Sequence, residues 1–310
     1  EALRTTFHMQ DSQPVQVIHE SLPCQVEYAK LSSNDDLEDV AQAYAQQPFD
    51  LESGPLLRIK LFQRSSQQQM LVFVVHHIIA DGWSVGVLIH EIMHLYPPLL
   101  AGQSPTLSNL AVQPVDFAQW RRQWLQGEVL QQQLDYWQRQ LKGATASLAL
   151  STDYPRQNEQ SFKGEVLSIA IPENLSQQLN RFSQQQGISL YMTLLSAFGV
   201  LLHRYSGQND VLIGSPIANR AHPQVQELIG LFLNTLVLRL DCDNNPRFSD
   251  FLKQVQQVTL DAYAHQDVPF ERLLENLPPE QQRSASPWFQ VMFILQNAHR
   301  QTLDIEGVEV

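Results

Sequence analysis

Apolar residues recur along this chain with two periods, one typical of strands and one typical of helices. The unbroken apolar run 70–75 is β-branched and aromatic, which predicts a strand that is buried on both faces. Beyond it the apolar positions step by three and four residues. This predicts a helix with Ser84 as its N-cap and its end at Pro97-Pro98. The expected buried face of that helix consists of Val85, Leu88, Ile89, Ile92 and Leu95.

The same two periods predict the elements further along the chain. Tryptophan and leucine residues three and four positions apart predict a single helix over 117–141. Two more helices are expected over 175–186 and 190–205, and two strands over 210–214 and 233–240. The segment Asp153–Asn158 breaks the pattern and is the expected linker between two parts of the chain. Since strands and helices mix without strict alternation, we expect an α/β fold with mixed sheets.

Composition and charge narrow the class of protein. The chain has 310 residues, of which 43% are hydrophobic, enough for one large core or two smaller ones. A net charge of −12 leaves no basic stripe for nucleic acid and disfavours an anionic membrane surface. No run approaches the roughly 18 apolar residues of a membrane helix. Two cysteines, Cys24 and Cys242, are too few for a disulfide framework and are typical of a cytoplasmic protein.

The most informative segment is His76-His77-Ile78-Ile79-Ala80-Asp81-Gly82, directly after the run 70–75. Because neighbouring strand residues point to opposite faces, only one of the two histidines can face a given cleft. An imidazole exchanges protons near neutral pH. Asp81 belongs to the same turn, and Gly82 permits a close backbone approach to a ligand or a positive φ. The segment therefore predicts a catalytic or binding site.

This segment resembles the His-His-x-x-x-Asp-Gly signature of the condensation domains of nonribosomal peptide synthetases, in the superfamily of chloramphenicol acetyltransferase. Other segments resemble further motifs of that family. They are Glu1–Phe7, Pro48–Leu51 with Gly54–Arg58, Ile229–Leu236, His265–Glu271 and Phe289–Phe293. Because these five further matches occur in the family's own order, chance does not account for them. The resemblance covers most of the chain.

The resemblance implies two chloramphenicol acetyltransferase-like lobes in a V, with the active site in a tunnel between them. We expect residues 1–155 to form the amino-terminal lobe, which carries the catalytic motif, and residues 156–310 to form the carboxy-terminal lobe. Each lobe looks truncated at its chain end, because the family's opening motif and its last segment are both missing. The expected setting is a longer assembly-line enzyme that makes antibiotics and other secondary metabolites.

The resemblance also implies an activity. A carrier-bound aminoacyl amine would attack a carrier-bound acyl or peptidyl thioester and form a peptide bond. Donor and acceptor peptidyl carrier domains and an adjacent adenylation domain are the expected partners, and the substrates arrive on phosphopantetheine arms. The domain itself is expected to bind no cofactor. Ala80–Ser84 and Phe289–Asn297 most resemble the subtype that joins an L-donor to an L-acceptor, while a starter (N-acylating) domain and an epimerisation domain stay open.

Residue roles follow from the same resemblance. His77 is the expected catalytic residue, either as general base or as the group that holds the amine. His76 is expected to orient the loop, and Gly82 to present its N–H to the developing oxyanion. Asp81 is expected to be structural and paired with Arg58. The candidate substrate-channel residues are Trp83, Ser215 and Asn234.

Two further patterns offer alternatives. The segment Gly82–Gly86 matches the nucleophile elbow Gly-x-Ser-x-Gly, which makes a serine hydrolase or thioesterase using Ser84 a remote alternative. The segment His90–His94 matches the His-Glu-x-x-His helix of zinc proteases. Because this segment has a single acid and no known partner ligand, and His76 and His77 have no third ligand at useful spacing, no metal is expected. From a different class, a non-catalytic docking scaffold also stays open.

Overall fold

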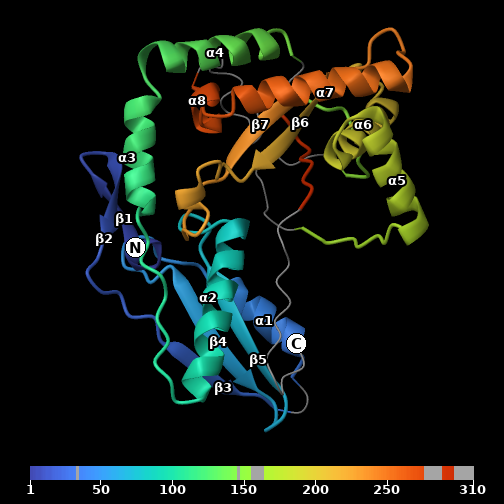
Figure 1. Cartoon of the computed structure of the whole chain (residues 1–310). Coiled ribbons are helices and arrows are strands. Elements are labelled where there is room, and N and C mark those ends of the chain that lie inside the picture. The colour runs from blue at the N-terminus through green and yellow to red at the C-terminus, as the bar shows by residue number, and fades with distance from the viewer. Residues whose placement is uncertain (33–34, 145–146, 155–163, 276–287, 297–310) are drawn as a thin grey trace. The chain divides into compact units, whose positions relative to one another are not determined.

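The computed structural model describes residues 1–32, 35–144, 147–154, 164–275 and 288–296 (Figure 1). These residues form two compact units, which are described separately. The first unit contains residues 1–121 and 220–232, and the second contains residues 122–219 and 233–296. Helices and small sheets occur in both units, which confirms the predicted mixed α/β class.

The first unit contains a hairpin and a three-stranded sheet. In the hairpin, Asp11 and Ser12 both take a positive φ, the backbone conformation that a tight two-residue turn requires. In the sheet the order is β3-β4-β5, with a parallel first pair and an antiparallel second pair. The elements are η1 (Ala2–Arg4), β1 (Thr5–Gln10), β2 (Gln13–Ile18), β3 (Val26–Lys30), α1 (Leu37–Ala45), β4 (Leu57–Gln63), β5 (Gln69–Val75), α2 (Gly82–Leu100), α3 (Pro114–Trp124, whose last three residues belong to the second unit) and η2 (Pro223–Val225).

The strand predicted over 70–75 is confirmed as β5, but its expected burial on both faces is wrong. Burial alternates along β5, and Leu71 and Phe73 on one face are exposed. The face of β5 that carries Leu71 and Phe73 is therefore open to solvent, and β4 is the sole neighbouring strand of β5 among the described strands. Such alternation is the pattern of a half-buried antiparallel strand.

The second unit has a more continuous core. Its central strands β6 and β7 pair antiparallel, and the consecutive residues Val211, Leu212 and Ile213 are all buried, so β6 is covered on both faces. Trp137 of α4 and Phe251 and Val255 of α7 belong to the same apolar cluster. The elements of this unit are α4 (Gly127–Leu141), α5 (Glu173–Gln186), α6 (Leu190–Ser206), β6 (Asp210–Ile217), β7 (Asn234–Asp241), α7 (Phe248–Ala264) and α8 (Phe270–Leu274).

Both predicted helices over 175–186 and 190–205 are confirmed, as are the strands over 210–214 and 233–240. The single helix predicted over 117–141 is wrong, because two helices separated at 125–126 occupy this stretch. Gly127, the first residue of α4, has a φ of +53°, which lies outside the right-handed helical region, so one continuous helix cannot pass through it. Apolar periodicity continued across the break, so the sequence pattern could not reveal it.

Helix α2 corrects three details of the prediction. It runs through Pro97 and Pro98 and ends at Leu100. A proline has no N–H to donate, but the carbonyl oxygens of Pro97 and Pro98 both accept backbone hydrogen bonds at the end of the helix. Asp81 is its N-cap instead of Ser84. Val85, expected on the buried face, is 40% exposed.

The predicted lobe boundary at residue 155 stays a prediction, since residues 155–163 lie outside the described part of the chain. The two compact units have other residue boundaries than the predicted lobes. Helix α4 belongs to the second unit because Trp137 is buried in that unit's core, and residues 220–232 belong to the first unit. Among the described residues no single helix is long and apolar enough to cross a membrane, although the bent pair α5 and α6 passes that test together.

Gly199 on α6 offers a direct test of packing in the second unit. A Cβ atom there would come within 2.6 Å of Cδ1 of Leu240 and 3.4 Å of the Phe251 ring. We expect Gly199→Ala to lower the free energy of unfolding by about 1–3 kcal/mol through overpacking. Gly86→Ala on α2 is the matched control, because a Cβ there meets nothing within 4 Å. It should raise the free energy of unfolding by about 0.5–1 kcal/mol. Urea denaturation measures both changes, and equal effects would contradict the packing described here.

Candidate functional site

The candidate site is the turn between β5 and α2, residues 76–81, which we call the histidine turn. Its first residue is fixed by backbone hydrogen bonds, from His76 N to Leu56 O (2.9 Å) and from Ile79 N to His76 O (3.1 Å). Ile79 and Ala80 are buried and anchor the turn in the first unit. The last residue, Asp81, caps α2. The turn is therefore held at both ends.

The two histidines of the turn have different surroundings. His76 Nδ1 accepts a hydrogen bond from Ile78 N (3.1 Å), and its ring lies edge-on against Phe49 at 5.7 Å. These contacts fit the predicted orienting role of His76. The side chain of His77 is exposed, and no described residue hydrogen-bonds to its ring. Of the two imidazoles, that of His77 is thus the more exposed to solvent.

Asp81 is buried, with 4% of its surface exposed, and its partner is Arg220. The Nη2 atom of Arg220 lies 3.0 Å from Oδ1 and 3.3 Å from Oδ2 of Asp81. Phe232 N donates a further hydrogen bond to Oδ2 (3.1 Å). Burial lowers the pKa of the Arg220 guanidinium, and the charge of Asp81 opposes this shift. A negative charge at the N-terminus of α2 is also favourable for the helix dipole.

The predicted pairing of Asp81 with Arg58 is wrong. Arg58 lies on β4, and its guanidinium donates to the carbonyl oxygens of Gln47 (2.7 Å), Pro48 (3.2 Å) and Tyr44 (3.5 Å). It also lies 4.1 Å from the centroid of the Phe49 ring. These carbonyl groups stand at and just beyond the end of α1, where a cation is favourable. Arg58 therefore secures the chain after α1 and makes no bond to the histidine turn.

The sequence analysis missed Arg220 as the partner of Asp81, and with it the way in which residues 220–232 join this site. Residues 220–232, which we call the strap, follow the second unit's β6 in sequence but belong to the first unit. Arg220 Nη1 donates to the carbonyl oxygens of Val225 (2.6 Å) and Leu228 (2.7 Å), and its guanidinium lies 4.1 Å from the Phe232 ring centroid. The Nε atom of Arg220 is buried without a hydrogen-bond partner among the described residues. One arginine thus shapes the strap and neutralises Asp81.

Ser84, the nucleophile of the hydrolase alternative, is 1% exposed. Its backbone N–H donates to Oδ1 of Asp81 (2.9 Å), as expected for the third residue of a capped helix. The hydroxyl lies 2.8 Å from Oδ1 of Asp81 and 2.8 Å from Gly230 O, and it accepts from Gly230 N (3.0 Å). A hydroxyl with these partners has no access to a substrate, which argues against the hydrolase.

Gly82 is the first residue of α2 and is exposed. The positive φ that its sequence position allowed is not used. A Cβ atom on Gly82 would meet nothing within 4 Å, so no packing in the described structure requires a glycine there. Its N–H belongs to the first turn of α2, where the N–H groups have no partner within the helix and the dipole favours negative charge.

The candidate substrate-channel residues lie in different units. Trp83 is 38% exposed, and its Nε1 donates to Gln226 O of the strap (2.7 Å). In the second unit, Ser215 is buried and its hydroxyl lies 2.6 Å from the Tyr191 hydroxyl. Asn234 is also buried, and its amide bonds to Gln266 O, Val268 O, Thr235 N and Phe270 N. Their channel role stays a prediction, and the bonds of Asn234 show in addition a structural clamp.

The His-Glu-x-x-His segment lies on α2, with His90 and His94 both exposed. Within the described part of the chain, no group of three or more His, Cys, Asp and Glu side chains is placed to hold a metal ion. Desolvation by burial raises the pKa of Glu91, and nearby Glu227 adds to this shift while His90 opposes it.

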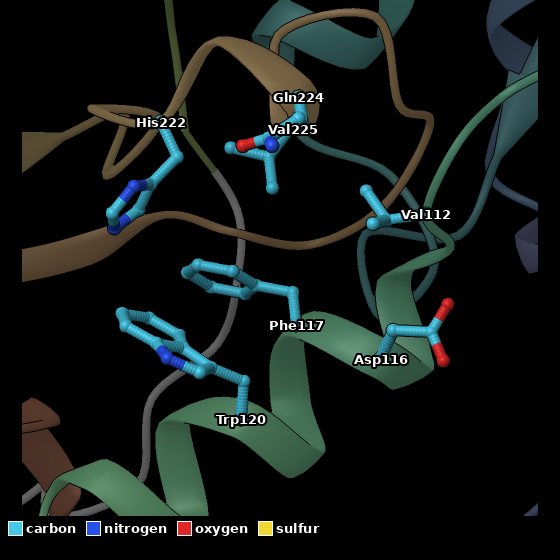
Figure 2. Close-up of a pocket in the computed structure, with 7 residues that line it drawn as sticks. All are labelled: Val112, Asp116, Phe117, Trp120, His222, Gln224 and Val225. Carbon is cyan, nitrogen blue, oxygen red and sulfur yellow. The ribbon is translucent and has the colours of Figure 1, made fainter.

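A cavity of about 340 Å³ lies in the first unit, on the side of the strap formed by its residues 222–225. Figure 2 shows the rings of Phe117 and Trp120 projecting from α3 toward it. Its lining consists of Val112, Asp116, Phe117, Trp120, His222, Gln224 and Val225. No residue of the histidine turn lines this cavity, so it is distinct from the candidate catalytic site.

Breaking the Asp81–Arg220 pair should strongly destabilise the first unit. We expect Asp81→Asn to lower the free energy of unfolding by about 3–5 kcal/mol, because it leaves a buried guanidinium without its counter-ion. Glu275→Gln is the control, since it breaks the exposed pair with Arg272 (3.2 Å) and should cost less than about 1 kcal/mol. Chemical denaturation measures both. A cost for Asp81→Asn as small as that of the control would show that the pair is not buried in solution.

Comparison with known proteins identifies relatives along the whole chain. A family model described as Condensation domain matches residues 1–309. A linear gramicidin synthase protein of Brevibacillus parabrevis is 45% identical over 303 residues, which are 96% of this chain and 4% of that protein. Gramicidin S synthase 2 of Aneurinibacillus migulanus is 39% identical over 313 residues, which are 99% of this chain and 7% of that protein. This chain therefore spans a small fraction of these relatives' length.

Solved structures agree with the sequence comparison. The X-domain from teicoplanin biosynthesis superposes with a TM-score of 0.84 and 27% identity, over 94% of this chain and 66% of that one. A holo four-domain nonribosomal peptide synthetase bound to AMP and glycine gives a TM-score of 0.83 and 26% identity, over 96% of this chain and 22% of that one. With the family model matching nearly every residue, the chain belongs to the condensation domain family of the nonribosomal peptide synthetases.

Proposed function

We propose that this chain forms an amide bond between two carrier-bound substrates. The observation that carries the proposal is the exposed imidazole of His77 on a turn fixed at both ends, in a chain of the condensation domain family. The amine nitrogen of the acceptor attacks the thioester carbon of the donor. The C–S bond breaks, the thiolate of the donor arm leaves, and the nitrogen loses a proton.

A thioester is already activated, so much of the catalysis is the placement of the amine against the carbonyl group. A neutral imidazole accepts a proton or holds an amine by a hydrogen bond, and His77 is proposed to do one or the other. In both mechanisms its position matters as much as its basicity, because proton transfer and hydrogen bonding require direct reach.

Gly82 is proposed to stabilise the oxyanion of the tetrahedral intermediate. Its N–H stands in the first turn of α2, where a developing negative charge is favourable. The space around its Cα supports this proposal, since nothing in the described structure fills the place of a Cβ. A substrate could then approach this backbone closely.

The finer assignments remain proposals. We propose an L-donor and an L-acceptor, with a starter and an epimerisation domain as alternatives within the family. Phosphopantetheine arms of donor and acceptor carrier domains would deliver the substrates to the domain, which holds no cofactor of its own, and an adenylation domain would lie next to it. The names of the gramicidin synthase relatives support a role in peptide antibiotic synthesis. A cytoplasmic location stays a prediction.

A docking scaffold is the second candidate, and one comparison favours it. One solved structure is a complex of the X-domain and OxyB from teicoplanin biosynthesis, and it is 28% identical to this chain with a TM-score of 0.81. A domain of this fold therefore also serves to bind a partner protein. The exposed His77 and the open space at Gly82 support the catalytic function over a docking role.

The first test is single-turnover transfer. A donor carrier loaded with an acyl thioester is mixed with an aminoacyl-loaded acceptor carrier, and intact-protein mass spectrometry follows the acyl mass. We expect the native protein to move that mass onto the acceptor and His77→Ala to lose about 100-fold or more of the rate, as for removal of a general base. His94→Ala, an exposed histidine on α2, is the matched control and should keep the native rate.

Carrier binding without transfer by the native protein would favour the docking scaffold. Labelling of Ser84 by a fluorophosphonate would contradict condensation and favour the hydrolase. Equal rates for His77→Ala and the native protein would remove His77 from the mechanism.

A second test addresses Gly82. Gly82→Ala should fold at least as stably as the native protein, because its Cβ meets nothing and alanine is the better helix former. We expect the transfer rate to fall by about 10-fold or more, because a methyl group would keep the substrate carbonyl away from the N–H. Thermal melting and single-turnover transfer check the two halves of this expectation. A native rate in Gly82→Ala would show that the oxyanion is not stabilised here.

A further inference from the structure

The Ser84 hydroxyl is saturated with hydrogen bonds although the proposed mechanism does not use it. A hydroxyl can accept two hydrogen bonds and donate one. Gly230 N (3.0 Å) and Arg220 Nη2 (2.9 Å) occupy the acceptor positions. The proton is shared between Oδ1 of Asp81 and Gly230 O, each 2.8 Å away. One buried atom thus joins the first turn of α2 to both ends of the strap.

The strap is also fixed to this helix end by two neighbours of Ser84. Asp81 accepts from Arg220 and from Phe232 N, and Trp83 Nε1 donates to Gln226 O. The Asp81–Arg220 pair supplies the charge compensation. Among the described residues, Ser84 is the one side chain that hydrogen-bonds to both the N–H and the carbonyl oxygen of Gly230. Gly230 is closely packed, since a Cβ there would come within 2.8 Å of the Phe232 ring and 3.2 Å of Pro114.

The position of His77 depends on this connection because its ring has no hydrogen bond of its own to a described residue. The backbone of the histidine turn sets the position of the His77 Cα and Cβ atoms, from which the imidazole projects. At the β5 end that backbone is held by the bonds of His76 and Ile79. At the α2 end it is held by Asp81 and Ser84, and through them by the strap.

We propose that Ser84 is a positioning residue, whose hydroxyl fastens the strap to α2 and thereby holds the histidine turn in its active geometry. This inference rests on the proposed function of His77. It assigns the serine of the Gly-x-Ser-x-Gly pattern a role without nucleophilic chemistry. Its loss should slow the chemical step and leave carrier binding unchanged, since the hydroxyl is too buried to touch a carrier or a substrate.

The experiment compares the native protein with three variants in the single-turnover assay. S84A removes the hydroxyl. G230A keeps the hydroxyl and displaces the strap, because the new methyl group would collide with the Phe232 ring. S196A is the matched control, since Ser196 is equally buried and its hydroxyl donates only to Met192 O of its own helix (2.7 Å).

We expect S84A and G230A to transfer about 10- to 100-fold more slowly at saturating carriers, as for a displaced catalytic group. Half-saturating carrier concentrations should stay within about twofold, the pattern of an interaction lost in the transition state alone. S196A should match the native protein in both quantities. Amide hydrogen exchange at Gly230 gives an independent readout, and it should become faster in S84A and stay unchanged in S196A.

A native transfer rate in folded S84A overturns the inference, and so does a loss of rate that S196A shares. If S84A fails to fold, G230A decides: a slower rate at saturation supports the inference, and a native rate overturns it. A native protein that transfers nothing overturns the proposed function together with this inference. Normal transfer by the native protein beside an equally active S84A overturns the inference alone.

Discussion

A buried carboxylate must find a cation and hydrogen-bond donors, and the arrangement of the first unit follows from how Asp81 finds them. Its cation, Arg220, is 139 residues further along the chain. Leaving either charge unpaired in this environment would cost about 3–5 kcal/mol, so the strap and the start of α2 stabilise each other. His77 precedes Asp81 by four residues on the same turn, so a backbone fixed at both ends carries a side chain open to solvent.

Much of the secondary structure was predictable because it depends on neighbouring residues. Helix α6 is a clear example: Ser189 caps it, accepting from Met192 N, and Gly207 ends it with a φ of +70°. Burial was less predictable because it depends on distant parts of the fold. An apolar run such as β5 has the same appearance at the edge of a sheet as at its centre. The break at Gly127 was not predictable either, because the helical spacing of apolar residues continues across it.

In the candidate site too, some residues were predictable from the sequence and one partner was not. His76, His77, Asp81 and Gly82 are contiguous, so a single sequence motif locates them. Arg220 is remote, and nothing in its neighbours distinguishes a buried arginine from a surface one. Arg58 was the nearer candidate, but the carbonyl groups after α1 compete for its guanidinium and satisfy it. Which cation meets a buried carboxylate is decided by tertiary packing that local pattern does not encode.

The first unit is discontinuous in sequence, and this affects the order in which it is made. A ribosome completes the histidine turn 139 residues before it reaches Arg220, an interval on the order of 10 s at typical elongation rates. During that time the second unit's residues 122–219 emerge, while Asp81 has not yet met its arginine. The histidine turn therefore reaches its final surroundings late in synthesis. A nascent chain that stalls within the second unit carries every residue of the histidine motif but lacks the partner that Asp81 requires.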